Sequence, residues 1–208
     1  MFTTIIDISW PISPDMTAYK DRSVVTFTAT KTYEKDHVRE ATIVLGTHSG
    51  THIDAPAHFL EFGQSLDKID LSKLVGHCKV LDLTHIHEKI TAQDLDMFDI
   101  TDNNRILLKT KNSLLDAQAR FDTGFVYLEK SGAEYLAAKN IISVGIDYLG
   151  IERNQPDHAT HSILLEKNIA IIEGLRLGHV EPREYILCCL PLALQGLEAA
   201  PARAILLA

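Results

Sequence analysis

The alternation of apolar and polar residues along the chain predicts a series of short strands. Residues 4–9 form a β-branched run that ends at a tryptophan–proline pair. Residues 24–30 and 40–45 alternate well enough to form two strands, joined through the charged segment 31–37. We expect these two strands to pair antiparallel, with the second strand leading into His48 and giving it a rigid support.

The middle of the chain predicts alternating strands and helices. Apolar runs indicate strands at residues 79–83, 105–110, 125–128 and 141–146. Ser131 is suited to cap a helix that continues to Ala138. A capping box of Thr91 and Asp94 opens a shorter helix. A helix between near-continuously apolar strands is typical of a parallel crossover, and a ligand site is expected where Asp147 follows the last of these strands.

The last third of the chain continues this alternation. Asp157 or Thr160 is positioned to cap a helix that carries His161. The strand that follows, residues 169–172, ends at Glu173. Two further strands, at residues 185–190 and 204–207, are separated by Pro191, Gly196 and Pro201. Strands and helices that alternate along the chain predict an α/β fold.

Composition narrows the class of protein. With 208 residues, 46% of them hydrophobic, the chain can bury one sizeable core, so we expect a single domain over residues 1–208. The net charge of −8 argues against nucleic acid or an anionic membrane as a partner and favours a small-molecule substrate. The three cysteines cannot all pair, which favours a reducing cytoplasm. No run approaches the roughly 18 apolar residues of a membrane span.

Metal-binding chemistry is concentrated between residues 48 and 59. The segment holds three histidines and one carboxylate within eleven positions: His48, His52, Asp54 and His58. Imidazole nitrogen and carboxylate oxygen together suit zinc, manganese or iron. Glycine at position 50 allows a tight turn, and proline at position 56 disfavours a helix, so we expect the site at the end of a strand and in the following loop. The alternative is a polar surface loop with one or two structural histidines.

The sequence HSGTHIDAPAHF resembles the signature of the metal-dependent hydrolase family that contains bacterial kynurenine formamidase, historically called the cyclase family. Further matches lie at residues 7–9, 145–147, 171–175 and 190–192. The resemblance implies a compact α/β domain with a mixed, barrel-like sheet and outer helices, of the swivelling β/β/α type. It also implies a homodimer or homotetramer, in which a neighbouring subunit sometimes contributes to the pocket.

The resemblance also implies a set of site residues. One metal would be held by His48, His52 and Asp54, and Asp54 would bridge to a second metal held by His161 and Glu173. The ions would be two zinc ions, with manganese as the alternative. His58 would carry a proton between the attacking water and the leaving nitrogen, although it could instead be a third histidine ligand. Tyr19 would line the substrate pocket. His158 is a second candidate for the metal-ligand role given to His161, but it does not match the spacing of the family.

The function implied by the resemblance is hydrolysis of a small amide, with N-formyl-L-kynurenine converted to L-kynurenine and formate in tryptophan catabolism. A rival in the same family opens a cyclic amide such as isatin with one manganese ion. A rival of another class is a metal-binding or small-molecule-binding protein without turnover. The sequence departs from the formamidase pattern at Tyr19, where tryptophan is typical, and at Gly150, Glu152 and Ser162, where serine, aspartate and histidine are usual.

Overall fold

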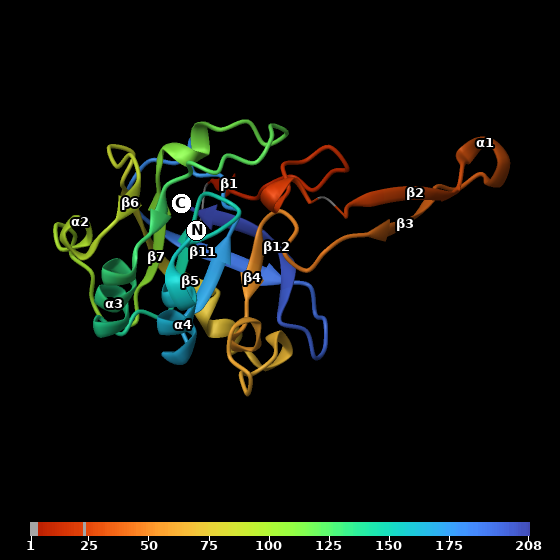
Figure 1. Cartoon of the computed structure of the whole chain (residues 1–208). Helices are drawn as coiled ribbons and strands as arrows, with labels where there is room; N and C mark the ends of the chain where they lie inside the picture. The colour runs from red at the N-terminus through yellow and green to blue at the C-terminus, as the bar shows by residue number, and fades with distance from the viewer. Residues whose placement is uncertain (1–3, 23) are drawn as a thin grey trace.

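One mixed sheet forms the centre of the molecule, and seven of its strands close into a barrel. The computed structural model describes residues 4–22 and 24–208. The strands of the sheet are β1 (Ile5–Asp7), β4 (His52–Asp54), β5 (Val75–Asp82), β7 (Arg105–Lys109), β9 (Ser143–Ile146), β10 (Ala170–Glu173), β11 (Glu184–Pro191) and β12 (Ala199–Leu207). Their order is β1-β12-β11-β5-β7-β9-β10-β4, and β4 also pairs with β12 (Figure 1). The predicted barrel-like sheet is therefore confirmed.

The two faces of the barrel strands bury different parts of the core. On β7, Leu107 points into the barrel, whereas Ile106 and Leu108 belong to the outer core that the helices cover. This separation follows from the two-residue period of a strand, and it explains why strands buried on both faces read as continuous apolar runs. The helices are α2 (Ala92–Leu95), α3 (Lys130–Ala138) and α4 (Ala159–Glu166). The predicted outer helices are confirmed.

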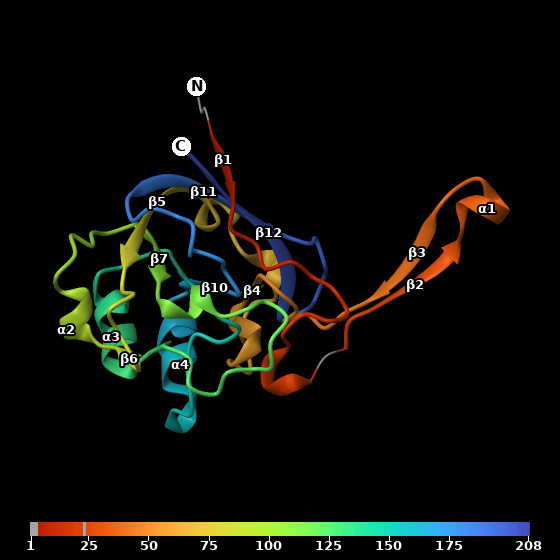
Figure 2. The same ribbon diagram turned by 90° about the horizontal axis from the view of Figure 1, so that it is seen from above.

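A long arm projects from this body. It consists of β2 (Thr26–Lys31), the short helix α1 (Tyr33–Asp36) and β3 (Glu40–Val44). The two strands pair antiparallel, as predicted, but every residue in them is exposed, so the prediction that the second strand gives His48 a rigid support is wrong. Both views show the arm extending away from the barrel, on the side opposite α2 and α3 (Figure 2).

The parallel crossover lies elsewhere than predicted. The segment 125–128 yields only β8 (Tyr127–Leu128), which pairs with β6 (Lys89–Ile90) in a separate two-stranded sheet. The parallel neighbours of β9 are β7 and β10. The apolar pattern identified strands but could not show which strand pairs with which. In the part of the chain that the structure describes, no helix has the length and apolar character to cross a bilayer.

Two helix caps differ from prediction. Glu129, rather than Ser131, caps α3 by accepting the backbone N–H of Ser131 at 2.9 Å. Neither Asp157 nor Thr160 caps α4. Its first turn is held instead by Glu152, which accepts the backbone N–H groups of Thr160 at 3.1 Å and His161 at 3.3 Å. A carboxylate eight residues before Thr160 replaces the local cap. The predicted capping box of Thr91 and Asp94 is confirmed.

One other expectation is wrong, and a second is only partly confirmed. Pro201 lies inside β12 instead of separating two strands. A pocket does lie beyond the carboxyl end of β9, as expected, because Leu149, Gly150 and Glu152 line it, but Asp147 itself is fully buried and is not among its described lining residues. Its carboxylate accepts the backbone N–H and hydroxyl groups of both Thr110 and Ser113. Although burial raises the pKa of Asp147 to about 6, these four donors oppose the shift. Asp147 therefore fixes the loop after β7.

Gly174 allows β10 to pass very close to the loop before β4. Its φ is +70°, and an added Cβ would lie 2.3 Å from the carbonyl oxygen of Gly50 and 3.1 Å from Cα of Thr51. At the same place, the hydroxyl of Thr51 donates to the carbonyl oxygen of Gly174 at 2.5 Å. This backbone contact fixes the distance between Glu173 and the histidine-rich segment.

We predict that Gly174→Ala strongly destabilises the protein. The left-handed backbone alone costs about 1–2 kcal/mol in a residue with a side chain, and the clash with backbone atoms adds to it. Gly196→Ala is a matched control, because Gly196 has φ +74° but nothing within 4 Å of an added Cβ. Urea unfolding of both variants measures the difference. Equal losses in the free energy of unfolding would show that the close approach at Gly174 is unimportant.

Candidate metal centre and pocket

The site is built on β4, the strand that closes the barrel. His52 and Asp54 lie two positions apart, so their side chains share one face of the strand, and both are buried. Glu173 at the end of β10 pairs directly opposite His52, and Nε2 of His52 lies 3.4 Å from Oε2 of Glu173. The expectation that His52 and Asp54 lie in a loop is wrong. The strand is only three residues long, which is too short to show an alternating pattern.

The loop before β4 brings His48 to the same place. Gly50 adopts φ +63°, as its predicted role in a tight turn requires. Nδ1 of His48 lies 3.1 Å from Oδ1 of Asp54. From the other side, α4 supplies His161, whose Nε2 lies 3.7 Å from Oδ2 of Asp54 and 3.3 Å from Oε1 of Glu173. Asp54 is thus the central residue, with histidines near both of its oxygens.

Several atoms of this cluster are buried without a hydrogen bond. Among the described residues, both carboxylate oxygens of Asp54 and Nε2 of His52 lack a hydrogen-bond partner. A buried carboxylate without donors is costly unless a positive charge compensates it. Two groups of side chains have ligand atoms close enough to share a cation, and both include Asp54: His48 with Asp54 and His58, and His52 with Asp54 and Glu173. The donor set therefore fits divalent cations such as zinc.

The buried carboxylates of the cluster favour the protonated, positively charged forms of His52 and His161. Although burial lowers the pKa of His52, the nearby Glu173 carboxylate and the charge of Asp54 raise it to about 9. Burial likewise lowers the pKa of His161, but contacts with Glu152 and Glu173 raise it to about 10. Burial raises the pKa of Glu173, yet His161 and His52 hold it well below its ordinary value. In the chain alone, protonated histidines supply the positive charge that a bound cation would otherwise supply.

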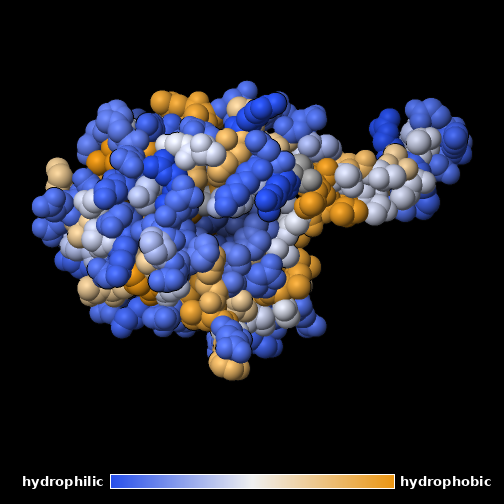
Figure 3. Space-filling view, in the orientation of Figure 1, coloured by the Kyte–Doolittle hydropathy of each residue, from blue (hydrophilic) through white to orange (hydrophobic). Residues whose placement is uncertain are grey.

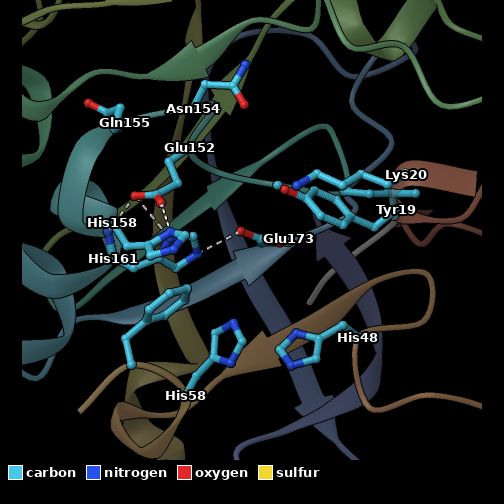
Figure 4. Close-up of a pocket in the computed structure, with 13 residues that line it drawn as sticks. Tyr19, Lys20, His48, His58, Glu152, Asn154, Gln155, His158, His161 and Glu173 are labelled. Carbon is cyan, nitrogen blue, oxygen red and sulfur yellow. Dashed lines mark hydrogen bonds and ion pairs between the residues drawn. The ribbon is translucent and has the colours of Figure 1, made fainter. Parts of the chain in front are cut away.

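Each histidine beside Asp54 directs its other ring nitrogen at an acceptor. For His52, Nδ1 lies 2.9 Å from the carbonyl oxygen of Gly50. For His161, Nδ1 lies 3.2 Å from Oε2 of Glu152 (Figure 4), and for His48, Nε2 lies 3.5 Å from Oε1 of Glu198. Such contacts orient histidine ligands and set their tautomers in metal sites.

His58 differs from these three histidines. It lies at the end of the 3₁₀ turn η2 (Pro56–His58), with its ring centroid 4.3 Å from that of His48 and 5.8 Å from that of His161. Its ring nitrogens make no hydrogen bond or ion pair with any described residue. Burial lowers the pKa of His58, so the neutral imidazole dominates near pH 7. A neutral ring can accept a proton, and without a fixed acceptor His58 lacks the partner that usually orients a histidine ligand. Its position beside His48 and Asp54 leaves ligation open.

A cavity of about 410 Å³ lies above this cluster. Figure 3 shows the opening as a hollow among hydrophilic residues beside the base of the arm. His48, His58, His161 and Glu173 form one end of the cavity, and Phe59 and Leu149 contribute apolar walls. Tyr19, in η1 (Tyr19–Asp21), also lines the cavity, as expected for the residue predicted to contact substrate.

The structure brings together the residues that the resemblance implied for the site: Tyr19, His48, His52, Asp54, His58, His161 and Glu173. It also adds residues that had no predicted role. Glu152 bridges His161 and His158, with Oε1 at 2.6 Å from Nδ1 of His158. Glu198 approaches from the start of the last strand, and Lys20 lines the cavity beside Tyr19. The only sequence signal for Glu152 was its departure from the formamidase pattern, because its contacts depend on tertiary structure.

Comparison with known sequences agrees with this site. Residues 6–153 match the family described as "Putative cyclase". The kynurenine formamidase of Salinibacter ruber is 31% identical over 205 residues, covering 97% of this chain and 96% of that protein. Cyclase-like protein 2 of rice, Oryza sativa subsp. japonica, is 36% identical over 172 residues and 78% of this chain. The aligned region spans only 63% of the length of the rice protein.

Comparison with solved structures gives the same result. A "predicted metal-dependent hydrolase" from Bacillus stearothermophilus superposes with a TM-score of 0.89 at 42% identity, covering 98% of both chains. An isatin hydrolase bound to the product analogue thioisatinate superposes with a TM-score of 0.86, covering 98% of this chain and 92% of its own. Its identity of 20% shows a shared fold only. From the sequence match and these relatives we conclude that the chain belongs to the cyclase family.

Proposed function

We propose that this protein is a metal-dependent amidohydrolase that converts N-formyl-L-kynurenine to L-kynurenine and formate, a step of tryptophan catabolism. The observation that carries the proposal is the buried Asp54 carboxylate, which lacks hydrogen-bond donors and lies among three histidines at the end of an open cavity. The kynurenine formamidase of Salinibacter ruber, which aligns along nearly the whole chain, supports the choice of substrate.

We propose two divalent cations as cofactors, with zinc as the first choice and manganese as the second. His48, His52 and Asp54 would hold one ion, and Asp54, His161 and Glu173 the other. In an alternative arrangement, His48 and His58 would share one ion with Asp54, and His58 would then be a ligand. Bound divalent cations supply Lewis acidity, which activates water near neutral pH and polarises a carbonyl group.

His58 completes the chemistry in this proposal. Its neutral ring accepts a proton from the attacking water and then donates it to the departing amide nitrogen, so that water and amide yield an acid and an amine. The fixed acceptors of His48, His52 and His161 keep those rings oriented, whereas His58 has none among the described residues. Phe59 stacks on His161 with ring centroids 4.3 Å apart, which gives an aryl amide an aromatic surface beside the reacting bond.

A cyclic amide such as isatin is the second candidate substrate. The departure at Gly150 favours it, because an added Cβ there would lie 3.4 Å from Cε2 of Tyr19 and from Cζ of Phe125. The absence of a side chain leaves space for a flat bicyclic ring against Tyr19. Isatin hydrolase shares the fold, although at 20% identity this likeness says nothing about substrate.

We also propose that the protein acts as a homodimer or homotetramer in the cytoplasm. The arm supports self-association, because an isolated two-stranded ribbon is only marginally stable in water and this one exposes Phe27, Ile43 and Val44. The free thiols of Cys78, Cys188 and Cys189 are compatible with a reducing compartment.

The first test is hydrolysis of N-formyl-L-kynurenine by purified protein, followed by the absorbance of kynurenine. We expect turnover that disappears after chelation and returns when zinc or manganese is restored. Formanilide and isatin, assayed in parallel, test simpler and cyclic amides. Hydrolysis of isatin alone would favour the second candidate, and metal binding without turnover of any of the three would indicate a binding protein.

The second test separates the two roles considered for His58. We predict that His58→Ala retains the metal content of the wild type, measured by elemental analysis, but loses at least about 100-fold in kcat, the usual contribution of a general acid–base group. His52→Ala is the control in which metal should be lost as well. Equal loss of metal in both variants would make His58 a ligand and refute its role in proton transfer.

A further inference from the structure

The cavity has two chemically different ends. The end described above contains the histidines and Glu173, and Glu152 lies beside it. Both of these lining carboxylates are already paired with His161, at 3.3 Å for Glu173 and 3.2 Å for Glu152. The opposite side is formed by Tyr19 and Lys20, which project together toward the open space (Figure 4).

Among the described residues that line this cavity, Lys20 is the only lysine or arginine. Its ammonium group lies over the ring of Tyr19, 5.1 Å from the centroid, and forms no ion pair with any described residue. Lys20 is exposed and lines the cavity, so its ammonium group is available to a ligand that enters.

Several contacts fix the backbone turn that contains Lys20. Lys20 has φ +53° and Asp21 has φ +57°, a left-handed conformation that residues with a Cβ seldom adopt. The carboxylate of Asp21 accepts the backbone N–H of Phe121 at 2.8 Å, and the ring of Phe121 packs edge-on against Tyr19 at 4.9 Å. These contacts fix the turn that directs Tyr19 and Lys20 into the cavity. Strained turns of this kind persist where the surrounding structure requires them, often at ligand sites.

We propose that Lys20 binds a carboxylate group on the substrate, and that the enzyme therefore selects aryl amides whose far end carries a carboxylate. The inference rests on the proposed amidohydrolase function and adds the group that determines specificity. The scissile amide would lie at the histidine end, the aryl ring between Tyr19 and Phe59, and the carboxylate at Lys20. A neutral amide such as isatin would gain nothing from Lys20, so this residue favours N-formyl-L-kynurenine over isatin.

The test compares a carboxylated and a neutral substrate in the metal-loaded enzyme. We expect Lys20→Met to raise KM for N-formyl-L-kynurenine about fivefold, the effect of one partly exposed charge pair, while kcat changes little. The same variant should leave kcat/KM for formanilide, which has no carboxylate, unchanged. Lys20→Arg should restore the KM for N-formyl-L-kynurenine. Lys35→Met, at the tip of the arm, is the matched control and should change neither substrate.

Two outcomes would overturn the inference while leaving the proposed function intact: equal changes for both substrates, or no change for either. If the wild type hydrolyses neither substrate, the proposed function fails. Calorimetric binding of L-kynurenine then still tests Lys20, because this product keeps the carboxylate. Weaker binding by Lys20→Met than by Lys35→Met supports the inference, whereas equal binding, or no binding to the wild type, refutes it.

Discussion

The site depends on the burial of one carboxylate. Asp54 lies in the strand that closes the barrel, fully buried, and neither of its oxygens accepts a hydrogen bond from a described residue. Compensation must therefore come from charge, and His48, His52 and His161 surround it within 3.1–3.7 Å. A position of this kind is unfavourable for folding alone, but it is what a site for a divalent cation requires.

Closure of the barrel is what assembles the cluster. β4 pairs with β10 on one side and with β12 on the other, so its register fixes Glu173 opposite His52. The sheet thereby joins residues more than 100 positions apart in sequence, and α4 adds His161 above them. Glu152 ties this helix to the site, since it accepts the first backbone N–H groups of α4 and also contacts the ring of His161. The contacts of Glu152 thus both stabilise α4 and orient the ring of His161.

The sequence predicted the chemistry of the site better than its geometry. The spacing of His48, His52 and Asp54 identified candidate metal ligands locally, because these residues lie within seven positions. His161 and Glu173 could be named only through a family resemblance, since their proximity depends on a helix-to-strand connection. Glu152, Glu198 and Lys20 carry no local pattern, and their roles follow from tertiary contacts. The wrong assignments of the caps of α3 and α4 have the same origin, because in both helices another carboxylate outcompeted the expected side chain.

The most direct test of this account is anomalous diffraction at the zinc edge from crystals of the zinc-loaded protein. The account predicts metal density beside the Asp54 carboxylate, within bonding distance of the surrounding histidines, and its loss in Asp54→Ala. Density found only at surface histidines, or a fully loaded protein in which Asp54 contacts no metal, would contradict the claim that a cation compensates this buried charge.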